Sequence, residues 1–127
     1  MSVHSLPLAA LFVALISLAS CNSGNTITQP RDVVFPDSNV SFVRHVQPLL
    51  QLGCAFNGCH AETSRIPLDS YVNLFRTPGL IVPGLPQNSM LWQVVAGQLP
   101  HTYPLSSLTP NHRTGISVWI REGALNN

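Results

Sequence analysis

Two of the three cysteines in this 127-residue chain lie close together, in the segment CAFNGCH that runs from Cys54 to His60. Four residues separate Cys54 from Cys59, and His60 follows the second cysteine directly. Thiolates and imidazoles are good ligands for transition metals, and two thiols can also join in a disulfide. The segment therefore allows three chemistries: a short disulfide loop, half of a zinc site, or covalent attachment of a haem.

Each of these chemistries requires different residues, spacing or conditions. A zinc ion needs about four ligands, and no second cysteine pair is present to complete the set. A disulfide needs only an oxidising compartment. Haem attachment uses two thiols and an imidazole at the spacing Cys-x-x-Cys-His, so two additional residues must bulge out here. Ala55, Asn57 and Gly58 are small or tolerate turns, which suits such a bulge.

The N-terminal residues indicate export. An apolar run from Leu6 to Leu18 leads through small residues to Cys21, which is the layout of a secretory signal. The ending LASC resembles the lipobox of bacterial lipoproteins, in which cleavage precedes the cysteine and the cysteine is acylated. We expect residues 1–20 to be a lipoprotein signal peptide and Cys21 to be the lipid anchor. The mature protein would lie on the periplasmic side of a bacterial membrane or in the outer membrane.

The rest of the chain divides into a tether and one domain. Residues 21–39 are expected to be the acylated cysteine and a flexible tether, because this stretch is polar and contains Pro30 and Pro36. Residues 40–127 have the size of one domain, whose small core a cofactor or a covalent staple would help to stabilise. The formal net charge is +1, and no basic face suggests binding to nucleic acid.

Apolar residues recur at helical spacing in two segments of the first half of this domain. The first segment is 41–52, where Pro48 lies inside the pattern and is expected to kink the helix or restart it. The second is SYVNLF, residues 70–75, with Asp69 as the expected N-cap and Pro78 beyond its end.

Two further helices are predicted in the second half. One follows Asn88 or Ser89 as its N-cap and stops at Gly97, and the other opens with the Thr-Pro step at Thr109 and closes at Gly123. Segments rich in proline and glycine lie between the helices, and no alternating strand pattern appears. The predicted fold class is all-α, with about four helices and long loops.

The segment 40–127 resembles the short c-type cytochrome domains of the planctomycete type. Four pieces match in the expected order: VSFVRHVQPLLQLGCAFNGCH, IPLDSYVNLF, IVPGLPQNSMLWQVVAG and LTPNHRTGISVWIREGALNN. The resemblance implies a small cytochrome c-like fold around one covalently bound haem c. It also implies that Cys54 and Cys59 form thioethers to the haem and that His60 is the proximal ligand of its iron.

The chain departs from the family at the opposite axial ligand. The family usually has a methionine in a Met-Pro step shortly before the last helix, and the alignment places Tyr103 there. His101 lies two residues earlier and offers an imidazole, and Met90 is the only methionine outside the signal segment. Tyr103 itself would have to ligate as a phenolate. His101, Met90 and Tyr103 are therefore the distal candidates.

Other distal arrangements also remain possible at this point. His45 and His112 are expected to be exposed rather than to ligate the iron, and the iron could also keep an open or water-bound position. With two protein ligands the domain would only pass electrons, whereas an open position would admit small molecules.

The resemblance implies a monohaem c-type cytochrome that carries single electrons between redox partner proteins and is not an enzyme. One alternative is a haem-based small-molecule sensor or weak peroxidase with an open distal site. Another is a haem-free, disulfide-bonded lipoprotein that acts as an interaction module.

Overall fold

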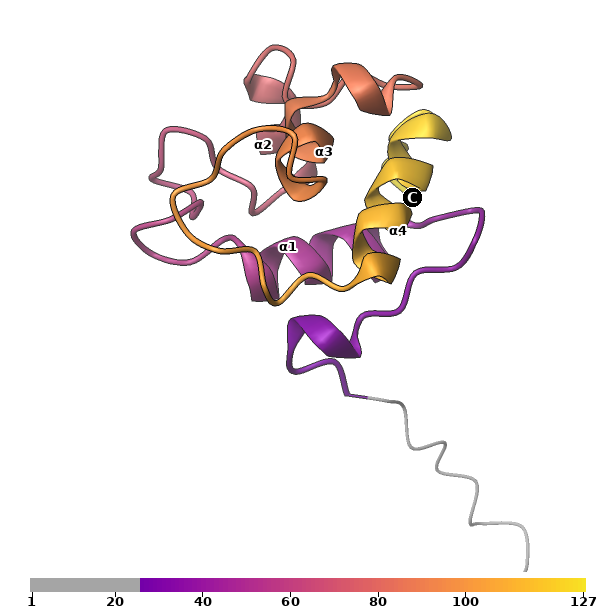
Figure 1. Ribbon diagram of the computed structural model, residues 1–127, viewed down its shortest axis with the longest axis horizontal. Helices are drawn as coiled ribbons and strands as arrows, with labels where there is room; N and C mark the ends of the chain where they lie inside the picture. Colours follow the sequence, from indigo (N-terminus) through magenta and orange to yellow (C-terminus); the bar gives the residue numbers. More distant parts are fainter. Residues whose placement is uncertain (1–25) are drawn as a thin grey trace, which may run out of the picture.

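A computed structural model describes residues 26–127 of the chain (Figure 1). The predicted signal peptide and Cys21 lie outside this part. Within it the α-helices are α1 (Gln47–Gly53), α2 (Tyr71–Arg76), α3 (Met90–Val95) and α4 (Pro110–Arg121). No β-strand occurs between residues 26 and 127, so the all-α prediction is confirmed there. None of the helices in this range has the length and apolar character needed to cross a bilayer.

The first predicted helix is present, but it forms in two parts. Residues Phe42–Val46 make a wide π-helical turn, in which the backbone N–H of Gln47 bonds to the carbonyl of Phe42, and α1 then begins at Gln47. Pro48 sits in the first turn of α1, where its missing N–H costs no hydrogen bond within α1. The expected restart at this proline is therefore confirmed.

The second and third helices have caps close to those predicted. The N-cap of α2 is Ser70, whose hydroxyl accepts from the N–H of Asn73, and not Asp69 as expected. The carboxylate of Asp69 instead accepts from the side-chain amide of Asn73 at 2.7 Å. Ser89 precedes α3, and Gly97 follows that helix with a φ of 76°, which is the left-handed conformation expected after a helix end.

Helix α4 begins and ends at the predicted residues, and a capping box closes its first turn. The hydroxyl of Thr109 accepts from the N–H of His112 at 3.2 Å, and the Nδ1 atom of His112 accepts from the N–H of Thr109 at 3.1 Å. Pro110 occupies the first helical position. Gly123 follows the helix with a φ of 102°.

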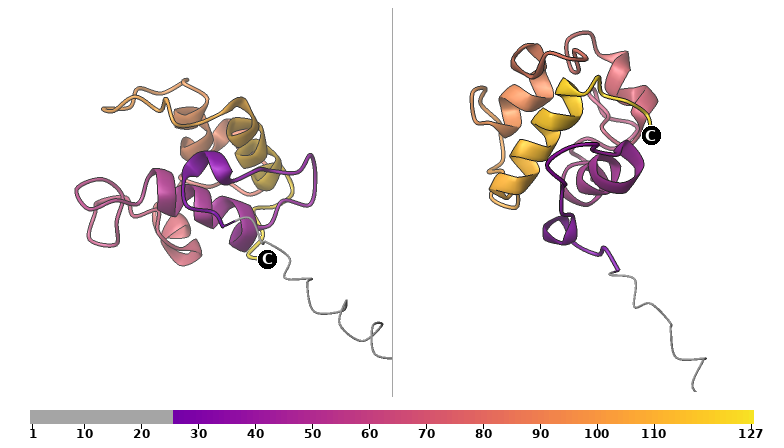
Figure 2. Two further views of the ribbon diagram at one scale, coloured as in Figure 1. Left: turned by 90° about the horizontal axis from the view of Figure 1, so that it is seen from below. Right: turned by 90° about the vertical axis from the view of Figure 1, so that its right-hand side faces the viewer.

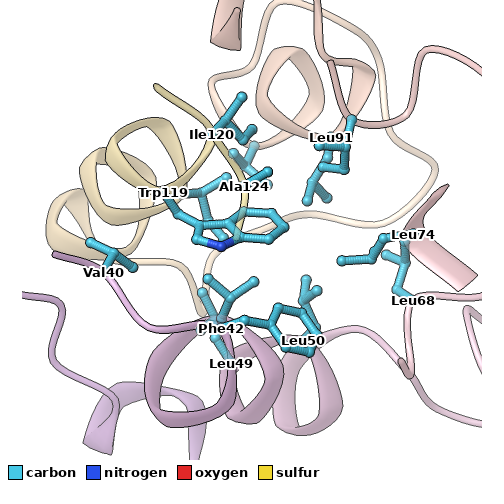
Figure 3. Close-up of a cluster of buried hydrophobic side chains, with 14 of the residues drawn as sticks. Val40, Phe42, Leu49, Leu50, Leu68, Leu74, Leu91, Trp119, Ile120 and Ala124 are labelled. Atoms are coloured by element: carbon cyan, nitrogen blue, oxygen red, sulfur yellow. The ribbon is translucent and has the colours of Figure 1, made fainter. Parts of the chain in front are cut away.

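The core is centred on Trp119 of α4 (Figure 3). This side chain is buried, and its indole N–H donates to the carbonyl of Leu125 at 3.0 Å. The Phe42 ring lies 5.7 Å from the Trp119 ring and 5.2 Å from the Tyr71 ring, measured between centres. Aromatic packing thus joins the start of the first helical segment to α2 and α4.

The end of the expected tether packs against the helical domain. Val33 and Phe35 are both buried. Asn111 holds the backbone of Phe35 from both sides, because its side chain accepts from the Phe35 N–H at 2.8 Å and donates to the Phe35 carbonyl at 2.9 Å. The Phe35 ring lies against Gly115 of α4. The expected flexible tether therefore does not extend to residue 39, and the packed domain begins before residue 40.

Two long loops extend from the helices on the same side of the molecule. One follows α1 and the other connects α3 to α4, and they lie on the same side in Figure 1 and in the left view of Figure 2. The first loop contains Cys59 and His60, and the second contains His101. The fold thus brings two segments about 40 residues apart in sequence to one face.

Candidate functional site

The two additional residues between the cysteines form a closed turn. Cys54 ends α1, with its N–H bonded to the carbonyl of Leu50 at 2.8 Å. The N–H of Cys59 then bonds to the carbonyl of Phe56 at 2.9 Å, and Gly58 at the third position of this turn has a φ of 83°. Glycine adopts that angle without steric cost. The predicted bulge is therefore a turn, and a 3.3 Å bond from the His60 N–H to the Cys54 carbonyl closes it.

The thiols of Cys54 and Cys59 are both free and lie in different surroundings. Cys54 is partly buried at the end of α1, whereas Cys59 is exposed. Burial, and secondarily the charge of Cys59, raises the pKa of the Cys54 thiol to about 11. Cys54 is therefore a neutral thiol at physiological pH.

Both thiols border a pocket of about 530 Å³ between the two loops. This volume lies in the range of small-molecule and cofactor sites. Apolar side chains form most of its wall, and none of its lining residues is charged. Leu68 and Leu91 belong both to this wall and to the buried core (Figure 3). All the candidate site residues of the domain line it, namely Cys54, Cys59, His60, Met90, His101 and Tyr103.

The two histidines of the pocket lie close together on different loops. The centres of the His60 and His101 rings lie 6.0 Å apart, with an angle of 32° between the ring planes. An imidazole nitrogen lies about 2 Å from a bound transition metal and about 1 Å from its own ring centre. Two imidazoles that bind one ion would therefore have their centres at most about 6 Å apart, so His60 and His101 are close enough to share a metal.

Hydrogen bonds fix the same tautomer in both rings. The Nδ1 atom of His60 lies 2.8 Å from the carbonyl oxygen of Ile66, and that of His101 lies 2.7 Å from the carbonyl oxygen of Tyr103. A carbonyl only accepts, so each Nδ1 carries a proton, and Nε2 is the nitrogen of each ring that is left to bind a metal. Metal-bound histidines typically have this arrangement, in which a backbone carbonyl orients the ring.

The other two distal candidates differ from His101. Tyr103 is exposed, and its backbone carbonyl holds His101 while its side chain borders the pocket. Met90 is partly buried at the first position of α3 and packs against the core. Of these three residues, His101 has the ring contact with His60.

His45 and His112 do not line the pocket. The expectation that His112 is exposed is wrong, because this side chain is buried and its Nε2 donates to the carbonyl of Val33 at 2.9 Å. Burial lowers the pKa of His112. His45 is partly buried, and its Nδ1 accepts from the N–H of Ser41 at 3.1 Å. Both side chains thus have structural roles at the start of a helix.

The sequence alone did not reveal Ile66, which orients His60. Pro67 follows it, and the α-helical conformation is disfavoured before a proline, so the Ile66 carbonyl is not used within a helix and accepts from the His60 side chain. An Ile-Pro step six residues after the histidine was the available signal, but only the fold shows that the chain turns back toward His60.

Within residues 26–127, no three or more His, Cys, Asp or Glu side chains gather where they could hold a metal ion by themselves. A haem needs only axial ligands from the protein, and the pocket offers two imidazoles. The chain matches no family model, no curated protein and no solved structure.

Proposed function

We propose that the protein is a monohaem c-type cytochrome that carries single electrons, with His60 and His101 as the axial ligands of the haem iron. The observation that carries this proposal is the pair of neighbouring imidazoles, with ring centres 6.0 Å apart, each with its Nδ1 bonded to a backbone carbonyl. The free thiols of Cys54 and Cys59 lie in the same pocket. Thiols, imidazoles and apolar walls are together the set that haem c requires.

Each residue of the site would have a separate task. Cys54 and Cys59 would hold the haem covalently through thioethers, and His60 would orient it from the adjacent position. His101 would fill the second axial position, which leaves no open coordination site for a substrate. A bound haem supplies reversible one-electron chemistry at its iron, and a second imidazole gives a lower potential than methionine does. The domain would therefore act as a carrier for redox partner proteins and not as an enzyme.

The same proposal includes the location of the protein. A lipid on Cys21 would attach the domain to a bacterial membrane, on its periplasmic side or in the outer membrane, which is also the side on which bacteria attach haem to thiols. The apolar run and the LASC ending of the sequence support this part of the proposal.

The test is expression of the full chain together with a cytochrome c maturation system that accepts the longer cysteine spacing. We expect one covalent haem per chain by intact mass and by the pyridine haemochrome spectrum. The low-temperature paramagnetic resonance spectrum of the oxidised protein should be that of a low-spin iron with two imidazole ligands.

Variants make this test specific. Cys59→Ala should lose covalent attachment at that thiol, and His60→Ala should lose the low-spin signal. His45→Ala removes a histidine that is remote from the pocket and should leave the spectrum unchanged. A chain that emerges with a Cys54–Cys59 disulfide and no haem would contradict the proposal and favour the haem-free interaction module.

A further inference from the structure

The pocket contains a second potential ligand besides His101. Met90 lines the same cavity as His60 and His101, and it is the only methionine among residues 26–127. Its thioether sulfur is a known axial ligand of haem iron. The two side chains approach the pocket from different elements, Met90 from α3 and His101 from the loop after it.

Met90 is held on a well-anchored part of the fold. Its N–H bonds to the carbonyl of Gly79 at 2.9 Å. The preceding residue, Ser89, is fully buried, and its hydroxyl bonds to the N–H of Val82 at 2.8 Å and to the carbonyl of Leu85 at 3.0 Å. The start of α3 is therefore fixed to the segment before it.

His101 lies on a loop that has few such anchors. Among the described residues, none from 100 to 107 forms a hydrogen bond with another element, and the bond from His101 to the Tyr103 carbonyl stays within the loop. Residues 100–104 are all exposed, and Pro100 and Pro104 have no N–H to donate. Moving this loop would break no hydrogen bond to the rest of the domain.

We propose that Met90 is an alternative axial ligand, which binds opposite His60 when His101 withdraws with its loop. This inference rests on the haem site proposed above and concerns the regulation of that site. The exchange is a ligand substitution, in which the bond from His101 Nε2 to the iron breaks and a bond from Met90 Sδ forms. No electron or proton is transferred in the exchange itself.

The oxidation state of the haem iron would decide which of the two ligands is favoured. Methionine ligation gives a higher potential than a second imidazole. By thermodynamic linkage, the methionine-bound form must then hold the added electron more tightly. Reduction of the iron by a one-electron donor therefore favours ligation by Met90, and its oxidation favours ligation by His101. The site would switch between a low-potential and a high-potential carrier.

The experiment compares wild type, His101→Ala, Met90→Leu and the double variant, each matured with haem in the full chain. The oxidised His101→Ala protein should show the weak long-wavelength absorption band of methionine-ligated iron, and the double variant should lack it. Ser106→Ala, an exposed change in the same loop that does not line the pocket, is the control and should match wild type. A His101→Ala spectrum identical to that of the double variant would overturn the proposal.

Fast-scan voltammetry provides a second measurement if His101→Ala does not fold. Wild type should show oxidation and reduction peaks that separate at high scan rate, and Met90→Leu should bring them together. Equal behaviour of the two proteins would exclude the exchange. Haem content by mass is measured first, because its absence from wild type overturns the haem site itself, whereas a haem-loaded protein without the exchange overturns only the role of Met90.

Discussion

Burial makes the Cys54 thiol hard to ionise, whereas the Cys59 side chain is exposed. Burial is the main reason why the pKa of Cys54 rises from 9.0 to about 11, and Cys59 is exposed. A rise of that size lowers the thiolate fraction of Cys54 at neutral pH by about a hundredfold. The thiolate is the reactive form, so the two cysteines should be chemically distinguishable although they lie in one short turn.

We expect Cys59 to be alkylated faster than Cys54, by at least about tenfold, in the reduced haem-free protein at neutral pH. The rates are measured by peptide mass spectrometry after timed exposure to iodoacetamide. In urea the two rates should converge, because the surroundings of Cys54 are lost. A ratio near one without urea would contradict the burial of Cys54.

His112 couples the N-terminal segment to α4. Its Nδ1 accepts from the N–H of Thr109, and its Nε2 donates to the carbonyl of Val33. Only the neutral ring can accept and donate at once. Burial is the main cause of its lowered pKa, and the Val33 carbonyl opposes that shift.

This arrangement predicts an acid-sensitive fold. The folded pKa of His112 lies below the unfolded value of about 6.5, so the unfolded chain binds more protons near and below that pH, and stability falls as the pH falls. We expect urea midpoints to decrease from pH 7.5 to pH 5.5. His112→Gln should be less stable at pH 7.5 and should lose part of this pH dependence. An unchanged pH profile in the variant would rule out this role of His112.

The Phe35 side chain packs against α4 at Gly115, which has no side chain of its own. A Cβ added at Gly115 would overlap the ring and the Cβ of Phe35, and this part of the Phe35 side chain lies too close to the backbone to move freely. Helix propensity alone would favour alanine over glycine by about 1 kcal/mol. The overlap should outweigh that gain, because overpacking typically costs about 1–3 kcal/mol.

Gly115→Ala is therefore expected to lower the free energy of unfolding by about 1 kcal/mol or more, measured by urea titration. Thr114→Ala is the matched control, because Thr114 is exposed on the same helix and should be neutral or slightly stabilising. If Gly115→Ala proved as stable as the control, Phe35 would not pack as described.

The helices were predictable because their signals are local. Thr109 with Pro110, and the glycines at 97 and 123, mark helix ends through backbone chemistry within a few residues. The burial of Phe35 had no such signal, because it depends on Asn111 and Gly115, about 80 residues away in sequence. Residue types, together with the resemblance to short c-type cytochrome domains, identified the candidates that line the pocket. They did not show which of them faces His60, because that depends on the path of a proline-rich loop.

Charged residues are scarce in the segments that line the pocket, where Glu62 and Arg65 lie between His60 and Ile66. No Asp, Glu, Lys or Arg occurs from residue 45 to 61 or from 77 to 112, and these segments supply most of the pocket lining. The formal net charge of the whole chain is only +1. Long-range electrostatic steering of a partner toward this face is therefore weak.

If the domain carries a haem as proposed, we expect the rate of electron exchange at this face to depend little on salt. Between about 10 mM and 150 mM ionic strength, the second-order rate constant with a small neutral redox mediator or a protein partner should change by less than about twofold. Stopped-flow absorbance measures this rate. A steep fall with salt would show that charged residues elsewhere on the surface direct the encounter.

The packing of the segment around Phe35 would also limit how far the domain could move from a membrane that holds a lipid on Cys21. An extended chain spans at most about 3.3–3.6 Å per residue. A fully extended tether from Cys21 to residue 39 would therefore span about 60 Å. Because η2 (Pro30–Asp32) contacts α1, only the residues from Cys21 to Pro30 would separate the proposed lipid from the packed domain, and they span at most about 30 Å. That distance is close to the width of the domain itself. If Cys21 is lipidated as proposed, a redox partner would have to come to the membrane surface, because so short a tether would not let the domain carry an electron far into the surrounding compartment.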